Sequence, residues 1–116
     1  MIFKDDFNIN ELEAERNKNA HKVKHNDAMT RNHVAIHPQN TKKHEKKKWE
    51  ICWDLRQKGK HFITEARFKD KNIRADIYVL DDDKMIEIET STYKLQERKN
   101  KYPDNTEFIL LNQGDK

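Results

Sequence analysis

Acidic side chains alternate with aliphatic ones in two neighbouring segments of this chain. Asp76 lies in the run R-A-D-I-Y-V-L, and Glu87 and Glu89 lie in the run M-I-E-I-E-T. Successive side chains of a β-strand point to opposite faces, so the aliphatic residues can face a core while the carboxylates share the other face. Carboxylate oxygens suit Mg²⁺, Mn²⁺ or Ca²⁺ better than Zn²⁺, which favours His and Cys. A Mg²⁺ ion there would polarise a phosphoryl oxygen and activate a water molecule, which indicates chemistry on a phosphate.

Residues 73–90 are predicted to form a β-hairpin about an Asp-rich turn. The pairing that collects the aliphatic residues on one face puts Asp76 opposite Glu89 and Tyr78 opposite Glu87. A slip of one residue would scatter the aliphatic residues over both faces, so this register is strongly specified. Like charges that face each other across strands are destabilising, and a fold that keeps them is expected to hold a cation between them.

The preceding segment, residues 61–68, extends the same acidic face. A hairpin between it and the next strand buries the aliphatic residues of both and places Glu65 opposite Asp76. Glu65, Asp76 and Glu89 then lie side by side across three strands. Glu87 lies two residues further along the same face. An ordinary sheet with a solvated or helix-covered polar face is the alternative, but four converging carboxylates favour a metal site.

Residues 42–59 are predicted to form the helix that precedes these strands. Thr41 is the expected N-cap, because its side chain can accept a hydrogen bond from the first turn. Trp49, Cys52 and Trp53 follow at spacings of three and four residues, which puts them on one apolar face of the helix. The two indole rings are therefore expected to be core residues rather than a platform on which nucleobases stack.

The hydrophobic pattern as a whole predicts the element order αβββαβ. The expected elements are a helix over 42–59, strands over 61–68, 73–80 and 85–90, a helix over 91–102 and a strand over 106–112. A crossover through the second helix normally returns the last strand parallel to the strand before it. Residues 42–116 are therefore predicted to form an α/β domain with a mixed four-stranded sheet flanked by helices.

Residues 1–41 lack a sustained hydrophobic period and are predicted to be an N-terminal extension that is partly helical or mobile. The segment holds two pairs of histidines four residues apart, His21 with His25 and His33 with His37. Such a spacing can hold zinc, but no cysteine or acidic partner follows at a matching distance. Exposed histidines in an Asn- and Lys-rich arm are the favoured interpretation.

The composition indicates one small domain with a thin core. Only 34% of the 116 residues are hydrophobic and 39% are charged, and no apolar run is long enough to span a membrane. The single cysteine cannot form an internal disulfide, which favours a reducing, cytoplasmic setting. Basic residues predominate in 42–60 and acidic ones in 61–92. This division suits a site that holds a metal and attracts a polyanion, although a solvated lysine-rich surface has the same composition.

The αβββαβ order, with R-A-D-I opening one strand and I-E-I-E-T-S forming the next, resembles the PD-(D/E)XK nuclease superfamily. The resemblance covers about residues 42–112 and is strongest to small archaeal or viral nucleases and to the Holliday-junction-resolvase-like branch. It implies a restriction-endonuclease-like core that uses Mg²⁺ or Mn²⁺ to hydrolyse DNA. Asp76 and Glu87 are the implied metal ligands, together with the main-chain carbonyl of Ile88. An acid from the first helix or first strand often completes such a site, and Glu50 or Glu65 matches that role.

One position departs from the family pattern. Glu89 stands where the family has the lysine that orients the attacking water and offsets charge on the phosphate. In some members this lysine has moved to a neighbouring helix, and Lys47, Lys48 and Lys94 are the candidates here. The catalytic residues implied by the resemblance are Asp76, Glu87, Glu89, Glu65 and Lys48.

The sequence therefore predicts an endonuclease of duplex or branched DNA that uses water directly, without a covalent intermediate, and acts inside a cell, as a viral or mobile-element protein would. A domain this small covers only part of a duplex, so a homodimer is expected. The residues expected to contact nucleic acid are Lys47, Lys48, Arg67, Arg74, Lys94 and Arg98. One alternative is a catalytically inactive member of the same fold that binds nucleic acid or a partner protein. A second is an unrelated α/β interaction protein whose acids are merely on the surface.

Overall fold

The computed structural model describes the main chain of residues 2–111 and the side chains of residues 10–91 and 95–111. The elements are α1 (Ile2–Ala20), α2 (His25–Ala28), α3 (Lys42–Gln57), β1 (Phe62–Arg67), β2 (Arg74–Val79), β3 (Lys84–Glu89), α4 (Thr92–Lys101) and β4 (Thr106–Leu110). From residue 42 onward, the predicted order αβββαβ is confirmed. The final residue of the expected strand 106–112 lies outside the described residues. None of the helices within 2–111 is long and apolar enough to cross a membrane.

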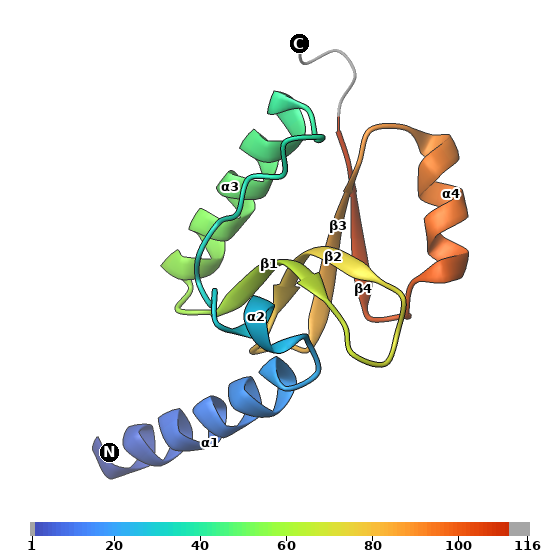
Figure 1. Cartoon of the computed structure of the whole chain (residues 1–116). Coiled ribbons are helices and arrows are strands. Elements are labelled where there is room, and N and C mark those ends of the chain that lie inside the picture. Colours follow the sequence, from blue (N-terminus) through green and yellow to red (C-terminus); the bar gives the residue numbers. More distant parts are fainter. Residues whose placement is uncertain (1, 112–116) are drawn as a thin grey trace.

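The four strands form one mixed sheet in the order β1-β2-β3-β4 (Figure 1). β1, β2 and β3 form an antiparallel meander, and β4 returns parallel to β3 after the crossover through α4. Figure 1 shows α3 and α4 on opposite sides of the sheet, while the N-terminal part of α1 projects away from the other elements. The predicted α/β architecture, a mixed four-stranded sheet flanked by helices, is confirmed.

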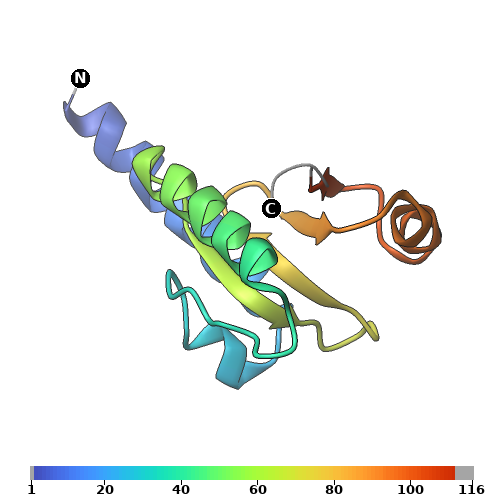
Figure 2. The ribbon, with the colours of Figure 1, turned by 90° about the horizontal axis from the view of Figure 1, so that it is seen from above.

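Both faces of the meander are buried, by different parts of the chain (Figure 2). On one face Cys52 and Leu55 of α3 pack against residues of β1, β2 and β3. On the other face Val23, between α1 and α2, is fully buried against Phe68 and Tyr78. Tyr78 is predicted to lie beside the acids on a polar face. That prediction is wrong, because the N-terminal segment supplies a second core.

The N-terminal segment also covers the free edge of β1. The main-chain N–H of Asn32 donates to the Phe62 carbonyl at 2.7 Å, and that of Lys24 donates to the Arg67 carbonyl at 2.8 Å. An uncovered strand edge is a template for aggregation, so this covering is useful in itself. Residues 1–41 are predicted to be a partly helical or mobile extension. They do contain two helices, and Val23 between these helices belongs to the same core as residues of the sheet.

The first hairpin has the predicted register, with Ala66 paired to Ala75 and Thr64 to Ile77. The ladder omits Glu65, whose φ of 50° lies in the left-handed region. Side chains on either side of this residue fall on different faces. Ala66 and Ala75 belong to the core under the N-terminal segment, whereas Ile77 belongs to the core under α3. Simple alternation predicts one face for all of them, and the left-handed residue breaks that alternation.

The second hairpin is shifted by two residues from the predicted register. Ile77 pairs with Ile86 and Tyr78 with Met85. A shift of two keeps every side chain on its predicted face, so hydrophobic alternation cannot distinguish the two registers. The consequence is that Asp76 lies beside Glu87, not opposite Glu89.

The outer face of α3 also differs from the prediction. Trp49 and Trp53 are expected in the core, but they are 52% and 54% exposed. Their rings stack on each other with centroids 5.6 Å apart. The inward face of α3 carries Lys48, Cys52 and Leu55 instead, so the helix buries one lysine where the sequence predicts indole rings.

Candidate functional site

The candidate site lies where β2 and β3 separate. The β2–β3 ladder ends at the pair Ile77 and Ile86. Beyond it the main-chain N–H of Asp76 donates to Glu87 Oε2 at 2.5 Å, and that of Ile88 donates to Asp76 Oδ2 at 2.8 Å. Two carboxylates thus take the place of main-chain carbonyls between the strands, which leaves their remaining oxygens available to other groups.

Glu87 is fully buried, and its environment is unfavourable for a charged carboxylate. Burial, and then repulsion from Asp76, raise the pKa of Glu87 to about 8. Two carboxylates that share a small volume cannot both ionise easily without a cation between them. A carboxyl group perturbed by burial and by a specific neighbour is a physical indication of a functional site.

Arg98 of α4 supplies a positive charge to this pair of strands. Its Nη1 lies 3.0 Å from Glu87 Oε1, and its Nε lies 2.9 Å from Glu89 Oε1. Arg98 is predicted to contact nucleic acid, yet in this conformation it holds two of the four predicted carboxylates. Glu89 is itself buried, so it belongs to the site although it does not face Asp76.

Lys48 of α3 is the lysine that reaches the site. Its side chain is fully buried, with Nζ 2.7 Å from Glu45 Oε2 and 3.1 Å from Glu65 Oε2. Lys47 is only half-buried, and the side chain of Lys94 lies outside the described residues. Of the two candidate lysines whose side chains the structure describes, Lys48 is the one that lies among the acids.

His44, one turn before Lys48, belongs to the same cluster. Its Nε2 lies 3.3 Å from Asp76 Oδ2, and its Nδ1 lies 2.8 Å from Glu45 Oε1. Burial alone would lower the pKa of His44, but the two carboxylates outweigh it and raise that pKa. Sequence reasoning misses His44 and Glu45 as site residues. The available signal is the spacing of four residues between His44 and Lys48, which puts both on one face of α3.

Glu65 completes the cluster from β1. Its Oε1 is buried and has no hydrogen-bond donor among the described residues, although Arg74 Nε lies 3.3 Å away in a poor geometry. Its left-handed main chain adds strain, and such strain is common at functional sites. Glu50, the other predicted candidate, is exposed on α3.

The donor set can be tested against the divalent metal that the sequence implies. Carboxylates and an unpaired buried oxygen are the ligands that Mg²⁺ takes. Within the described residues, however, no three His, Cys, Asp or Glu side chains are placed as ligands of one ion, the four histidines of residues 21–37 included. Lys48, His44 and Arg98 meet the negative charge instead. The chemistry of the donors fits a hard cation, and these side chains would have to rearrange to hold it.

A basic cavity of about 550 Å³ opens beside the cluster. Its lining residues are Asn72, Arg74, Glu97, Arg98, Lys101 and Tyr102. The Tyr102 hydroxyl donates to the Arg74 carbonyl within this lining. Arg98 connects the cavity to the carboxylates through its contacts with Glu87 and Glu89. Arg67, predicted to bind nucleic acid, lies elsewhere, and its guanidinium and main-chain N–H donate three hydrogen bonds to the Asp27 carboxylate. Three basic side chains around one cavity make it suitable for an anion.

Burying this cluster of charges costs free energy of folding, in a protein whose core is small. Charges removed from water are costly, and buried ion pairs rarely stabilise a fold more than apolar residues of the same size would. The presence of these buried charges therefore points to a role in binding or chemistry.

Compared with protein-family models, with curated proteins and with solved structures, this chain shows no significant match.

Proposed function

We propose that this protein is a divalent-metal-dependent DNA endonuclease with Asp76 and Glu87 as its principal metal ligands. The observation that carries the proposal is the pair of carboxylates between the separating ends of β2 and β3, with the buried Lys48 beside them. Bound Mg²⁺ or Mn²⁺ would supply an activated water and polarise the phosphate. The element order and the positions of Asp76 and Glu87 support this proposal by their resemblance to the PD-(D/E)XK pattern, with Lys48 in place of the motif lysine that Glu89 replaces.

The remaining residues of the cluster have separable roles in this proposal. Glu65 and the Ile88 carbonyl are the further metal ligands. Lys48 offsets negative charge near the scissile phosphate, as the displaced family lysine would. Glu89 holds Arg98, and Arg98, Arg74 and Lys101 bind the phosphates on either side of the cleaved bond.

The decisive experiment measures cleavage of plasmid, branched and single-stranded DNA with Mg²⁺, with Mn²⁺ and with EDTA. Wild type is compared with Asp76→Asn and Glu87→Gln, and circular dichroism checks that each variant folds. Glu107→Gln is the matched control, because Glu107 on β4 forms an exposed ion pair with Lys84, away from the cluster. We expect both site variants to fall to the EDTA level and the control to cleave like wild type. Equal cleavage by all four proteins would refute the assignment.

One observation favours the alternative of an inactive binding module. Arg98 already forms ion pairs with both Glu87 and Glu89, where a metal ion would otherwise supply the positive charge. Nucleic-acid binding that needs no metal, with no cleavage of any substrate, would support this alternative. In that case Glu89→Lys, which restores the family pattern, is a direct test of whether position 89 causes the inactivity. The interaction-protein alternative is left if neither metal nor nucleic acid binds at low salt.

The proposed nuclease would act as a homodimer, because one domain of 116 residues contacts only part of a duplex. Analytical ultracentrifugation with and without a short duplex tests this. Two protomers per duplex are expected, and a monomer on DNA at all protein concentrations would contradict the dimer.

A further inference from the structure

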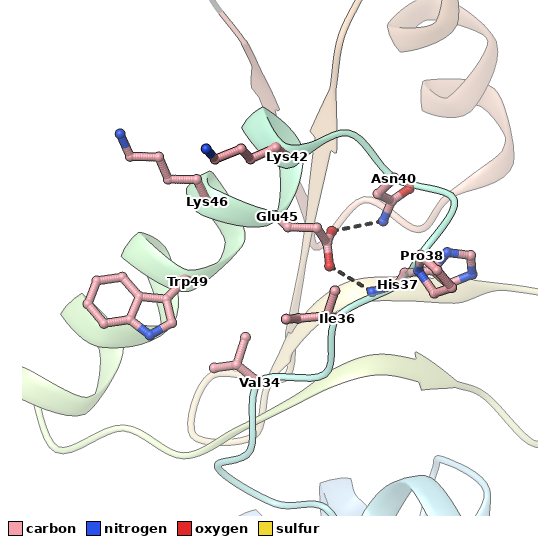
Figure 3. A pocket seen from close by; sticks show the side chains of 9 residues that line it. All are labelled: Val34, Ile36, His37, Pro38, Asn40, Lys42, Glu45, Lys46 and Trp49. Atoms are coloured by element: carbon pink, nitrogen blue, oxygen red, sulfur yellow. Dashed lines mark hydrogen bonds between the residues drawn. The ribbon is translucent and has the colours of Figure 1, made fainter.

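A second cavity, separate from the basic one, opens between residues 34–40 and α3 (Figure 3). Its volume is about 550 Å³. Val34, Ile36 and Pro38 line one side, and the indole ring of Trp49 lines the other (Figure 3). We call this cavity the slot; apolar side chains stand on two sides of it.

The apolar side chains around this slot are unusually exposed for so polar a protein. Ile36 is 77% exposed, and Trp49 and Trp53 are about half exposed although stacked on each other. Exposed large apolar groups that gather at one place mark binding surfaces. The core does not need these rings, because Cys52 and Leu55 form the apolar part of the inward face of α3.

Positive charge adjoins the apolar slot on the same helix. Lys42 and Lys46 line the cavity, are exposed, and precede Trp49 and Trp53 along one face of α3 at spacings of three and four residues. The one acid of the lining, Glu45, has its charge met by Lys48 at 2.7 Å. Cations followed by flat aromatic rings match the alternation of phosphate and base in a single strand.

We propose that this slot holds an unpaired base of single-stranded nucleic acid, with the adjoining phosphates on Lys42 and Lys46. The inference rests on the proposed nuclease function for its biological meaning and deepens it, because it assigns a single-stranded segment to the substrate. Glu45 joins the two sites, since it lines the slot and also contacts His44 and Lys48 of the cluster. A paired base is stacked inside its duplex and cannot enter the slot.

Intrinsic fluorescence gives a direct test, because Trp49 and Trp53 are the only tryptophans of the chain. Wild-type protein in EDTA, where metal-dependent cleavage is absent, is titrated with three probes. These are a single-stranded oligothymidylate, an abasic single strand of the same length, and a blunt-ended duplex. We expect the oligothymidylate to quench the fluorescence and to bind about tenfold more tightly than the abasic strand of equal charge. The blunt duplex should leave the tryptophan fluorescence unchanged, because its paired bases cannot enter the slot.

Variants separate stacking from charge. Trp49→Leu keeps an apolar helix residue but removes the flat ring, and it should bind the oligothymidylate about tenfold more weakly in a fluorescence-anisotropy titration. Trp49→Tyr should retain most of the affinity. The double variant Lys42→Gln/Lys46→Gln should reduce the slope of log affinity against log salt by roughly 1 to 1.5.

Each outcome bears on the slot separately from the nuclease. Equal affinity for the thymidylate and abasic strands, or no loss in Trp49→Leu, would overturn the slot even if metal-dependent cleavage is found. The slot would also be overturned if the duplex quenches the fluorescence as strongly as the oligothymidylate does. Quenching by a proline-rich peptide and not by the oligothymidylate, or quenching that follows only self-association of the protein, would overturn it as well. Tight thymidylate binding by the Asp76→Asn variant, together with no cleavage by wild type, would support the slot and refute the nuclease.

Discussion

At the scale of single residues, the site consists of charges that hold one another in place. Lys48 has no exposure, and its Nζ lies within 3.1 Å of two glutamates. His44 and Arg98 make the equivalent contacts to Asp76 and Glu87. The cluster is therefore sensitive to the loss of any one member, because its partner would be left buried and unpaired.

Lys48→Met should destabilise the protein by about 3 kcal/mol, because Glu45 and Glu65 lose their shared cation. Adding Glu65→Gln should recover about 1 kcal/mol, since one uncompensated charge is removed. Urea unfolding measures both, with the half-buried neighbour Lys47→Met as control. Additive losses in the double variant would show that Lys48 and Glu65 do not interact.

The Glu45 carboxylate predicts a pH dependence of stability. Burial by itself would raise the pKa of Glu45, but hydrogen bonds from Lys48, His37 and neighbouring groups lower it from 4.5 to about 2. A carboxylate with a lowered folded-state pKa stabilises the fold above its unfolded pKa and loses that contribution as the pH falls. Glu45→Gln should therefore flatten the decline in thermal stability between about pH 4.5 and about pH 2. Glu50→Gln, an exposed acid on the same helix, should decline as wild type does.

At the scale of elements, the turn between β2 and β3 fixes the register that forms the site. Asp81 in this turn accepts the main-chain N–H of His61 at 2.8 Å and two hydrogen bonds from Arg16 of α1. Asp83 has a φ of 50°, and its carboxylate accepts the Tyr78 hydroxyl. These contacts hold the β2–β3 pairing two residues from the predicted register, and so bring Asp76 beside Glu87.

Arg16→Ala should weaken both the docking of α1 and the turn. Its guanidinium binds Asp81 through Nε at 3.1 Å and Nη2 at 3.0 Å and donates to the Gly59 carbonyl. The expected loss is about 2 kcal/mol, the scale of a charged hydrogen-bonded group, measured by urea unfolding. Lys18→Ala, an exposed residue on the same helix, should lose far less. Equal losses would mean that the contacts of Arg16 do not stabilise the fold.

At the scale of the whole molecule, the N-terminal segment and the sheet share buried contacts. Val23 is fully buried, and Asn19 donates to the Leu80 carbonyl at 2.7 Å from a fully buried position. Small domains with thin cores are only marginally stable, so the loss of such contacts is expected to unfold them. The N-terminal segment is then needed for the site, although it contributes none of its carboxylates.

A chain that begins at residue 42 should therefore fail to fold, although it contains every strand and the whole carboxylate cluster. Thermal unfolding followed by near-ultraviolet circular dichroism should show no cooperative transition, whereas the full chain should show one. A cooperative transition and metal-dependent cleavage by residues 42–116 alone would instead support the boundary at residue 41 that the sequence predicts.

The element order could be predicted from the sequence because it depends on local signals. Thr41 does cap α3 by accepting the N–H of His44, and period-two alternation does locate β1, β2 and β3. The register of the first hairpin, β1 with β2, was also predictable, since few other registers would pair its aliphatic residues with one another. Alternation alone cannot separate registers that differ by two residues, and it cannot foresee the left-handed Glu65.

By itself, the sequence determined which residues could do chemistry: Glu65, Asp76, Glu87, Glu89 and a lysine of the first predicted helix. Tertiary structure decided how they meet. It placed Asp76 beside Glu87, selected Lys48, added His44 and Arg98, and turned Trp49 and Trp53 outward. Hydrophobic periodicity shows which side chains share a face of a helix or strand, because the residues of one face recur at a fixed spacing along that element. Which faces meet, and in which register, depends on contacts between segments far apart in the chain, and local patterns do not encode these.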